Sequence, residues 1–569
     1  MTTHWKATWD PNPTTRAYLE AHPEDLSATR LSFGTAGLRA AMGPGSHAMN
    51  ELVALQTAQG LVQYCGDLPK IVVIGYDHRS SPQWNVSSHS MALYSALVFS
   101  HAGWTVHLYD RLVATPIVPF GVGYYGATLG IMVTASHNPA RDAGYKVYWK
   151  DGCQIRSPLD EGMAACILDN LEPWKDYAAE LAKETTTMSS AEETDKVLDA
   201  YFQAIRDSGL VVPPPSDDTH VKIAYTALHG VGYPFLQRAF EAFGLDPVYS
   251  LPSQQDPDPA FPTVAFPNPE EPGALDAVQA FATDQNCPII LANDPDADRL
   301  AVSEQIDGIW HTLSGDQVGL LLAQWLHQQQ QTTTSQPLAC CASTVSSQLL
   351  RVYCESHHIQ FVDTLTGFKW IGSQAQQLSQ KYHVLLAYEE ALGYCCGGAT
   401  GVWDKDGLTA AGVLAQLVRA TYAQQQTLHD VLDAVAETYG HFVSKNGYRV
   451  LEDVSLVPEL VNAVTKHQHW DQLQSIGGYA VTGIRYLGDP GGYDSSTIDQ
   501  KPTLPTSASS PLVTYRFANG CVVHLRASGT EPKFKYYMEL RGKPGVRREE
   551  VEKELDVMQA VLLREFGLV

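Results

Sequence analysis

Short apolar runs alternate with helix-like stretches over most of the chain. Near the N-terminus, the runs 70–74, 104–109 and 128–133 predict strands, and 88–100 predicts a helix between the first two. The further predicted strands are 221–227, 248–251, 288–292, 338–345, 359–362 and 384–388, and the further predicted helices are 197–205, 235–243, 275–282, 317–326, 408–424 and 428–438. This alternation is typical of sheets that are covered by helices.

The pattern changes near residue 446, where short strands predominate. Strands are predicted at 448–451, 479–486, 513–517, 521–525 and 533–540, followed by an amphipathic helix at 549–566. Asn519-Gly520 lies between two of these strands and predicts a hairpin. We therefore expect an α/β protein, with three α/β domains that have mixed sheets and a smaller C-terminal α+β domain.

The expected domain boundaries follow breaks in the pattern. The stiff polar segment Pro213-Pro214-Pro215-Ser216-Asp217-Asp218 marks the first break. The four domains are expected at 1–212, 213–313, 314–445 and 446–569.

Composition excludes several classes of function. The 569 residues include 62 Asp+Glu and 38 Lys+Arg, so the net charge is −24, and a surface this acidic repels nucleic-acid backbones. No apolar stretch reaches the length of about 18 residues that a membrane helix needs, and the N-terminus lacks the apolar core of a signal peptide. Ten cysteines are too few for a disulfide scaffold in a chain of this length. We expect a cytoplasmic protein with reduced thiols.

The first loop with candidate chemistry is Thr134-Ala135-Ser136-His137-Asn138-Pro139, here called the serine loop. It follows the predicted strand 128–133, and open α/β sheets bind ligands at this end of their strands. Ser136 is a candidate nucleophile, which needs a base or a strong electrostatic field to act at neutral pH. His137 is adjacent, but neighbouring side chains usually point apart. A plain polar turn explains these residues equally well in isolation.

The second loop is Asp294-Pro295-Asp296-Ala297-Asp298-Arg299, here called the aspartate loop, which follows the predicted strand 288–292. Carboxylates at alternate positions are expected to share one side of an extended segment. Three clustered negative charges favour a hard dication with oxygen ligands, Mg²⁺ in particular. The calcium-loop pattern fails, because Arg299 and Gln305 stand where it needs Gly and Glu. A solvated acidic turn is the alternative.

Two further loops carry charged and hydroxyl side chains. The segment 387–394 contains Glu389, which can accept two sugar hydroxyls, and Lys405 downstream can balance a phosphate. The segment 526–533 combines Arg526 with hydroxyl side chains around Gly529, which suits an anion site. Each of these signals is weak by itself.

Taken together, the loops resemble the α-D-phosphohexomutase superfamily, in its phosphoglucomutase/phosphopentomutase branch related to glucose-1,6-bisphosphate synthase. The resemblance covers nearly the whole chain and depends on the order of the motifs. These are Phe33-Gly34-Thr35-Ala36-Gly37-Leu38-Arg39, Gly75-Tyr76-Asp77-His78-Arg79, the serine loop with Gly144-Tyr145-Lys146, the aspartate loop, Leu365-Thr366-Gly367-Phe368-Lys369, Glu389-Glu390 and 526–532. The family fold that it implies has four domains around a central cleft.

The resemblance also implies roles for individual residues. Ser136 would be the phosphoserine, Lys146 the general acid/base and Arg39 the residue that stabilises the transferring group, with His137 a further catalytic candidate. Ser136 and the three aspartates would bind one Mg²⁺ per chain. The residues expected to bind substrate are Arg299, Thr366, Glu389 and Lys405, with Arg526, Ser528, Gly529 and Thr530 for the non-reacting phosphate. Aspartates near Lys146 would raise its pKa, whereas burial would lower it.

The implied activity is an intramolecular phosphotransfer between C1 and C6 of glucose phosphate, between C1 and C5 of ribose or deoxyribose phosphate, or both. A sugar bisphosphate would be the intermediate and activator. Many relatives have Ser two residues after the sugar-binding Glu, where this chain has Ala391, and this difference is compatible with a pentose phosphate. The alternatives are a glucose-1,6-bisphosphate synthase, a catalytically inactive phosphosugar-binding protein and a simple metal phosphatase. We expect a monomer that binds small sugar phosphates, and neither nucleic acid nor membrane.

Overall fold

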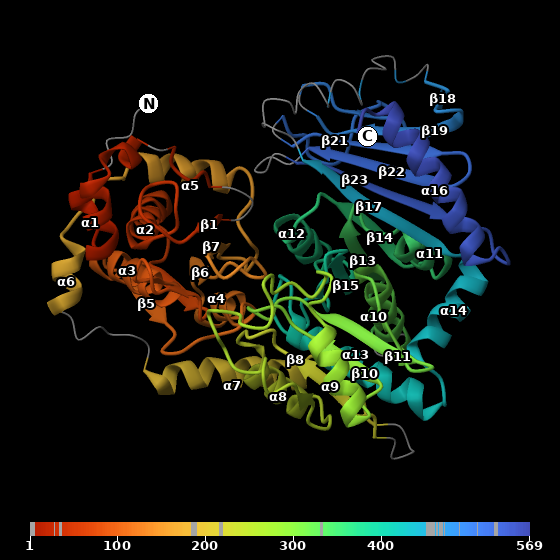
Figure 1. Ribbon diagram of the computed structural model, residues 1–569, viewed down its shortest axis with the longest axis horizontal. Helices are drawn as coiled ribbons and strands as arrows, with labels where there is room; N and C mark the ends of the chain where they lie inside the picture. The colour runs from red at the N-terminus through yellow and green to blue at the C-terminus, as the bar shows by residue number, and fades with distance from the viewer. Residues whose placement is uncertain are drawn as a thin grey trace. The chain divides into compact units, whose positions relative to one another are not determined.

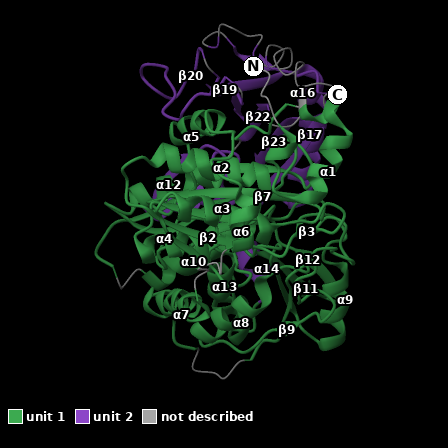
Figure 2. Ribbon diagram, turned by 90° about the vertical axis from the view of Figure 1, so that its left-hand side faces the viewer, with its two compact units in different colours: residues 1–342, 367–426 green, residues 343–366, 427–569 purple. Residues whose placement is uncertain are grey.

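Strands and helices alternate through the part of the chain that the computed structural model describes. This part comprises residues 6–27, 29–33, 37–183, 190–214, 220–330, 334–450, 461, 465, 470, 473–488, 490–508, 510–527 and 533–568. The chain forms two compact units, which are coloured separately in Figure 2. The first unit comprises 1–342 and 367–426, and the second comprises 343–366 and 427–569.

The first sheet has five strands and belongs to the first unit. Its order is β1 (Gly37–Ala41), β7 (Asp142–Trp149), β6 (Leu129–Val133), β2 (Ile71–Tyr76) and β5 (Thr105–Leu108). β2 runs parallel to β5 and β6, whereas β7 is antiparallel to both β1 and β6. The carboxyl ends of β2 and β6 therefore lie at the same edge, and the serine loop starts there.

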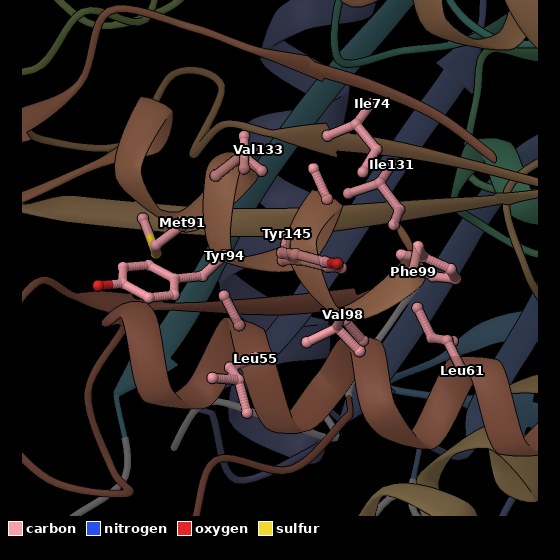
Figure 3. Packing of buried hydrophobic residues seen from close by; sticks show 14 of the residues in the cluster. Leu55, Leu61, Ile74, Met91, Tyr94, Val98, Phe99, Ile131, Val133 and Tyr145 are labelled. Atoms are coloured by element: carbon pink, nitrogen blue, oxygen red, sulfur yellow. The ribbon is translucent and has the colours of Figure 1, made fainter. Parts of the chain in front are cut away.

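Both faces of this sheet are covered by helices, as its apolar parallel strands require. Val72 and Ile74 of β2 belong to a buried cluster with α2 (Glu51–Cys65) and α3 (Ser88–His101). Gly75, which is also in β2, lies close to Val118 of α4 (Ile117–Tyr125). This helix covers the opposite face. Figure 3 shows the first of these layers, with Leu55, Leu61, Ile74, Val98, Phe99 and Ile131 among the labelled side chains.

A second five-stranded sheet and three strands of another sheet also lie in the first unit. One has the order β12 (Ile309–Thr312), β11 (Ala301–Ile306), β10 (Ile289–Ala292), β8 (Ile223–Thr226) and β9 (Tyr249–Ser250), with α8 (Gly232–Ala242) and α9 (Asp276–Gln285) between its strands in the chain. In the other, β15 (His383–Glu389) is parallel to its neighbour β13 (Leu338–Ser343) and antiparallel to its neighbour β16 (Gly393–Cys395). The helices near this sheet in the chain are α10 (Gly315–Gln330), α12 (Phe368–Leu378) and α13 (Gly407–Ala423).

The second unit is built on an antiparallel sheet. Its main path is β17 (Phe442–Val450), β23 (Lys533–Arg541), β22 (Cys521–Ala527), β21 (Leu512–Phe517), β19 (Tyr479–Tyr486) and β18 (Ser475–Ile476), and β20 (Tyr493–Asp494) pairs with β19. α16 (Arg548–Glu565) packs across this sheet through Leu555, Met558 and Leu562 (Figure 1). The unit also contains α11 (Gln348–Ser356), β14 (Gln360–Thr364) and α14 (Leu428–Tyr439).

The predicted fold class, α/β with mixed sheets and a β-rich C-terminal part, is confirmed. The Asn519-Gly520 hairpin joins β21 and β22, with Gly520 at a φ of 89°. The sequence pattern did not predict α2, β1 or β7, and the predicted start of β17, at residue 448, is too late, because the strand begins at Phe442. The four domain boundaries stay predictions. None of the helices in the described residues combines the length and the apolar character of a membrane span.

The packing of α2 predicts the cost of a truncation. Leu55 is 1 % exposed, so Leu55→Ala removes buried methyl groups and leaves a cavity. We expect the free energy of unfolding to fall by about 3 kcal/mol. Differential scanning calorimetry should show the corresponding transition at a lower temperature. Leu168→Ala is the control, because Leu168 is 55 % exposed and its truncation should change stability by less than about 0.5 kcal/mol.

Candidate active site

The serine loop begins where β6 ends and turns sharply at Ser136. Ser136 has a φ of 54°, a left-handed conformation that is uncommon for a residue with a side chain. Its N–H donates to Thr134 Oγ1 over 2.8 Å, which stabilises the turn. Ser136 is 2 % exposed, whereas the neighbouring His137 and Asn138 reach solvent. Ser136 is therefore more deeply buried than the two residues that follow it in the loop.

The aspartate loop begins where β10 ends, and it is a turn. The N–H of Ala297 donates to the carbonyl of Asp294 over 2.9 Å, and Ala297 has a φ of 57°. The prediction of an extended segment is wrong, because this left-handed residue folds the loop back. The carboxylates nevertheless converge, since one oxygen from each of Asp294, Asp296 and Asp298 lies within 4.8 Å of the other two.

The two loops meet through direct side-chain contacts. Ser136 Oγ donates to Asp294 Oδ2 over 2.8 Å. Lys146, on β7, donates to Asp296 Oδ2 over 2.7 Å and to Asp298 Oδ2 over 2.8 Å. The serine hydroxyl, the lysine ammonium and the three carboxylates therefore form one connected group.

Burial makes the charges of this group strongly interdependent. All three aspartates are 0 % exposed. Burial and the charges on Asp296 and Asp298 raise the pKa of Asp294 well above its usual range. For Lys146, burial alone would lower the pKa, but Asp296 and Asp298 outweigh it and raise the pKa above its ordinary value. Lys146 is therefore an ammonium ion in this arrangement.

These residues fit a divalent metal. Asp296 Oδ1 and Asp298 Oδ1 are buried and have no hydrogen-bond partner in the described residues. Unpaired buried carboxylate oxygens are costly unless a cation coordinates them. An all-oxygen donor set that includes the nearby Ser136 hydroxyl suits Mg²⁺.

His137 and Arg39 complete the surroundings of the serine. His137 Nδ1 lies 3.3 Å from Ser136 Oγ, so these neighbours do not point apart as expected. Burial, with the positive charges of Arg299, Arg39 and Lys405, holds the pKa of His137 well below its usual range, and the ring is neutral at pH 7. Arg39, on β1, is exposed and donates to Asn138 Oδ1 over 2.9 Å.

Arg299 joins the aspartate loop to a neighbouring segment. Its N–H donates to Asp294 Oδ1 over 3.0 Å, and its guanidinium lies 3.3 Å from Glu270 Oε2. Its side chain keeps 9 % exposure, so the guanidinium is held beside the carboxylates.

Lys405 and Glu389 extend the charged group beyond the aspartate loop. Lys405 Nζ lies 3.5 Å from Asp298 Oδ2 and 3.6 Å from Glu389 Oε1. A Cβ at Gly393 would lie 2.3 Å from Lys405 Cδ, so a side chain at this position would displace the lysine from its present place. The Lys405 ammonium is therefore shared between the aspartate loop and the glutamate.

Comparison with known proteins agrees with this geometry. Three family models match in order, those of phosphoglucomutase/phosphomannomutase alpha/beta/alpha domains I, II and III, at residues 30–173, 199–306 and 314–439. Human phosphopentomutase is 40% identical over 98% of this chain and 94% of its own length. The chain belongs to the phosphoglucomutase/phosphomannomutase family. Human glucose 1,6-bisphosphate synthase is 35% identical over 97% of this chain and 92% of its own length.

Solved structures of the family share the fold. The open form of the Paramecium phosphoglucomutase parafusin has a TM-score of 0.67 and 17% identity, covering 95% of this chain and 97% of that one. The predicted family and the predicted enzyme class, an intramolecular phosphotransferase, are confirmed.

The structure brings together most of the site residues predicted by the family resemblance. Hydrogen bonds, ion pairs and electrostatic interactions within the first unit connect the following residues: Arg39, Ser136, His137, Lys146, Asp294, Asp296, Asp298, Arg299, Glu389 and Lys405. Thr366 and Arg526 belong to the second unit. Ser528, Gly529 and Thr530 lie outside the described residues.

Residues that the sequence did not indicate also contact the site, among them Thr115 and Glu270. Thr115, just before α4, donates to Asp296 twice, from Oγ1 to Oδ2 over 2.7 Å and from its N–H to the carbonyl over 2.9 Å. Glu270 pairs with Arg299. Thr115 follows the strand β5 at the same sheet edge as the serine loop, and this position is the signal that could have indicated it.

The metal interpretation predicts the result of removing one charge. Asp296→Asn keeps the side-chain shape but removes a ligand charge, so we expect Mg²⁺ affinity to fall by about tenfold or more. Isothermal titration calorimetry measures this without any substrate. Asp284→Asn, on the exposed face of α9, is the matched control and should leave the titration unchanged. A titration of the Asp296 variant that equals the wild type would contradict the metal site.

Proposed function

We propose that this protein is a phosphosugar mutase that moves a phosphoryl group between two hydroxyl oxygens of one sugar phosphate by way of Ser136. The observation that carries the proposal is the 2.8 Å hydrogen bond from Ser136 Oγ to Asp294, inside a buried triad of carboxylates. A hydroxyl beside a cation site is suited to accept and return a phosphoryl group, because phosphoryl transfer depends mainly on positioning and charge neutralisation.

The proposed cycle consists of two phosphoryl transfers. In the first, the P–O bond of phosphorylated Ser136 breaks, the oxygen of a sugar hydroxyl bonds to phosphorus, and the hydroxyl proton leaves to a base while Ser136 Oγ gains a proton. The resulting sugar bisphosphate reverses its orientation. In the second transfer, Ser136 Oγ loses its proton to a base and bonds to the phosphorus of the other phosphoryl group, while the P–O bond of that group to the sugar breaks and the sugar oxygen gains a proton. The net result is an isomerised sugar monophosphate and a restored phosphoserine.

The charge states in the site suggest how its residues divide the proton transfers. Neutral His137 is an acceptor within 3.3 Å of Ser136 Oγ, and it suits the step in which the hydroxyl must lose its proton. Lys146 is charged and suits a donor role. Arg39 supplies positive charge next to the serine loop. Mg²⁺ held by Asp294, Asp296, Asp298 and an oxygen at Ser136 would neutralise charge on the transferring group.

For the substrate, we propose a pentose phosphate, ribose or deoxyribose with exchange between C1 and C5, and also glucose phosphate with exchange between C1 and C6. The phosphopentomutase relatives at 40% identity support the pentose. Ala391 offers no hydroxyl two residues after Glu389, and a pentose presents fewer hydroxyls to bind. The sugar bisphosphate is proposed as intermediate and activator, and Glu389 and Lys405 as sugar-phosphate contacts.

The second candidate is synthesis of glucose 1,6-bisphosphate from an external phosphoryl donor. It is supported by the glucose 1,6-bisphosphate synthases, which are 35% identical over nearly the whole chain. The same serine and carboxylates would serve both reactions, so only the product distinguishes them.

We also propose that the protein acts as a monomer in the cytoplasm on small sugar phosphates. Nine of its ten cysteines are buried and none forms a disulfide in the described residues, as expected of a chain that folds in a reducing compartment.

Substitution of the serine tests the proposal. Ser136→Ala should abolish isomerisation of ribose 1-phosphate and glucose 1-phosphate, because no oxygen remains to carry the phosphoryl group. A coupled assay with Mg²⁺ and added sugar bisphosphate measures this, and circular dichroism verifies folding. Ser100→Ala, at the exposed end of α3, should retain wild-type turnover. Full activity of Ser136→Ala would eliminate the serine as carrier.

The same assay separates the two candidate reactions. A mutase should isomerise ribose 1-phosphate or glucose 1-phosphate faster than it forms a bisphosphate from a triose bisphosphate donor. The reverse ratio would favour the synthase.

Arg526 is expected to hold the non-reacting phosphate. It lies on β22, and its Nε is 3.4 Å from Ser510 Oγ. Arg526→Ala should raise KM about tenfold with little change in kcat, because a contact made equally in the ground and transition states is lost. Steady-state kinetics measures the two constants. Arg548→Ala, at the exposed start of α16, is the control, and a fall in kcat alone would assign Arg526 a different role.

A further inference from the structure

Arg79 is a buried arginine that contacts the serine loop through its backbone. Its exposure is 1 %, and it follows the end of β2. One terminal nitrogen donates to the carbonyls of Ser136 and Asn138, both over 2.6 Å. The other donates to the carbonyls of Pro139 and Asp142 over 2.8 and 3.0 Å. The guanidinium therefore binds four carbonyls within seven consecutive residues.

The remaining nitrogen of Arg79 faces a carboxylate that is itself fixed. Arg79 Nε lies 3.4 Å from Asp77 Oδ2, and both side chains are fully buried. Asp77 Oδ1 accepts from Ser88 Oγ, at the start of α3, over 2.6 Å and from the N–H of Arg79 over 3.0 Å. A guanidinium has five N–H groups in a rigid plane. Here the two terminal nitrogens donate to four carbonyls, whereas Nε makes an ion pair with Asp77 and has no hydrogen-bond partner in the described residues.

A ring from another segment covers the guanidinium. Phe261 is 3 % exposed, and its ring centroid lies 5.1 Å from the guanidinium carbon of Arg79. This cation–π contact is made by a residue in the long connection between β9 and α9. Water is therefore kept from the hydrogen bonds that join Arg79 to the loop.

The loop that Arg79 binds contains the left-handed Ser136, with its φ of 54°. Such a conformation persists in a residue with a side chain only where the surroundings over-determine it. Asn138, bound by Arg79 through its carbonyl, also presents its side chain to Arg39 over 2.9 Å. A displacement of the loop would therefore move both the serine hydroxyl and the partner of Arg39.

We propose that Arg79 is a positioning residue that fixes the turn at Ser136, so that Oγ keeps its place at Asp294 through both phosphoryl transfers. Asp77 orients the guanidinium, and Phe261 shields it from water. The inference rests on the proposed function only where activity is concerned, because the fixed turn is a property of the loop itself.

The principal variant is Arg79→Lys, which keeps the charge and loses the planar fork. One ammonium group cannot reach four carbonyls and a carboxylate, so the loop should loosen while the sheet persists. We expect hydrogen exchange of a peptide covering 134–144 to accelerate about tenfold or more, with exchange of the α16 peptide 548–565 unchanged. We expect kcat to fall about a hundredfold, with KM within threefold of the wild type.

Arg141→Lys is the matched control. Arg141 belongs to the same connection between β6 and β7, but its side chain is 81 % exposed. Its variant should match the wild type in exchange, kcat and KM. Circular dichroism and the thermal midpoint establish that each variant is folded.

Asp77→Asn provides a second test, in which the guanidinium stays and its ion pair is lost. It should accelerate exchange in the same peptide to a smaller extent, and it decides the question by the same criteria if Arg79→Lys does not fold. The proposal is overturned by wild-type exchange in 134–144, by faster exchange spread evenly over β2, β6 and β7, or by a change in KM alone. If the wild-type protein turns over no sugar phosphate, the proposed function fails, and the exchange data still decide the role of Arg79.

Discussion

The structure of the site depends on the cost of burying three carboxylates side by side. Asp294, Asp296 and Asp298 are fully buried, and their mutual repulsion would exclude this arrangement if no cations opposed it. Lys146 and Lys405 reach the triad from distant parts of the chain, and Arg299 follows Asp298 within the aspartate loop itself. The hydrogen bond from Ser136 then ties the nucleophile to the same charges. Attraction between charged side chains therefore assembles the site, and Asp296 Oδ1 and Asp298 Oδ1 remain without a hydrogen-bond partner in the described residues.

Much of this assembly was predictable because apolar strands lead directly into polar loops. The runs before the serine loop and the aspartate loop are buried strands, β6 and β10, and their loops occupy carboxyl ends as predicted. The helix α2 escaped prediction because 12 of its 15 residues are buried, so it has no polar face. Its Gln56 and Gln59 look solvent-facing in the sequence, but they donate to the carbonyls of Leu171 and Asn170.

Contacts between segments that are far apart in the chain could not be predicted from the sequence. The family resemblance pointed to Lys146, but whether its pKa rises or falls depends on the two aspartates that the fold places at 2.7 and 2.8 Å. Thr115 lies 181 positions from Asp296, and no local pattern connects them. The left-handed Ala297 likewise turned an apparently extended acidic run into a compact turn. In each case the residue type was visible, whereas its role depended on the tertiary structure.

The two loops that meet at Ser136 and Asp294 share one physical property, which is a strained residue braced from outside the loop. Ser136 is braced by the carbonyl contacts of Arg79, and the turn with Ala297 is braced by Thr115 and by the N–H of Val231, which donates to the Pro295 carbonyl over 2.9 Å. Such bracing fixes the reacting atoms before substrate arrives, so less of the binding energy is spent on ordering them. A mutase needs this more than a simple phosphatase does. The same oxygen must give a phosphoryl group to one hydroxyl and take it back from another, and both reactions require an unchanged position for Ser136.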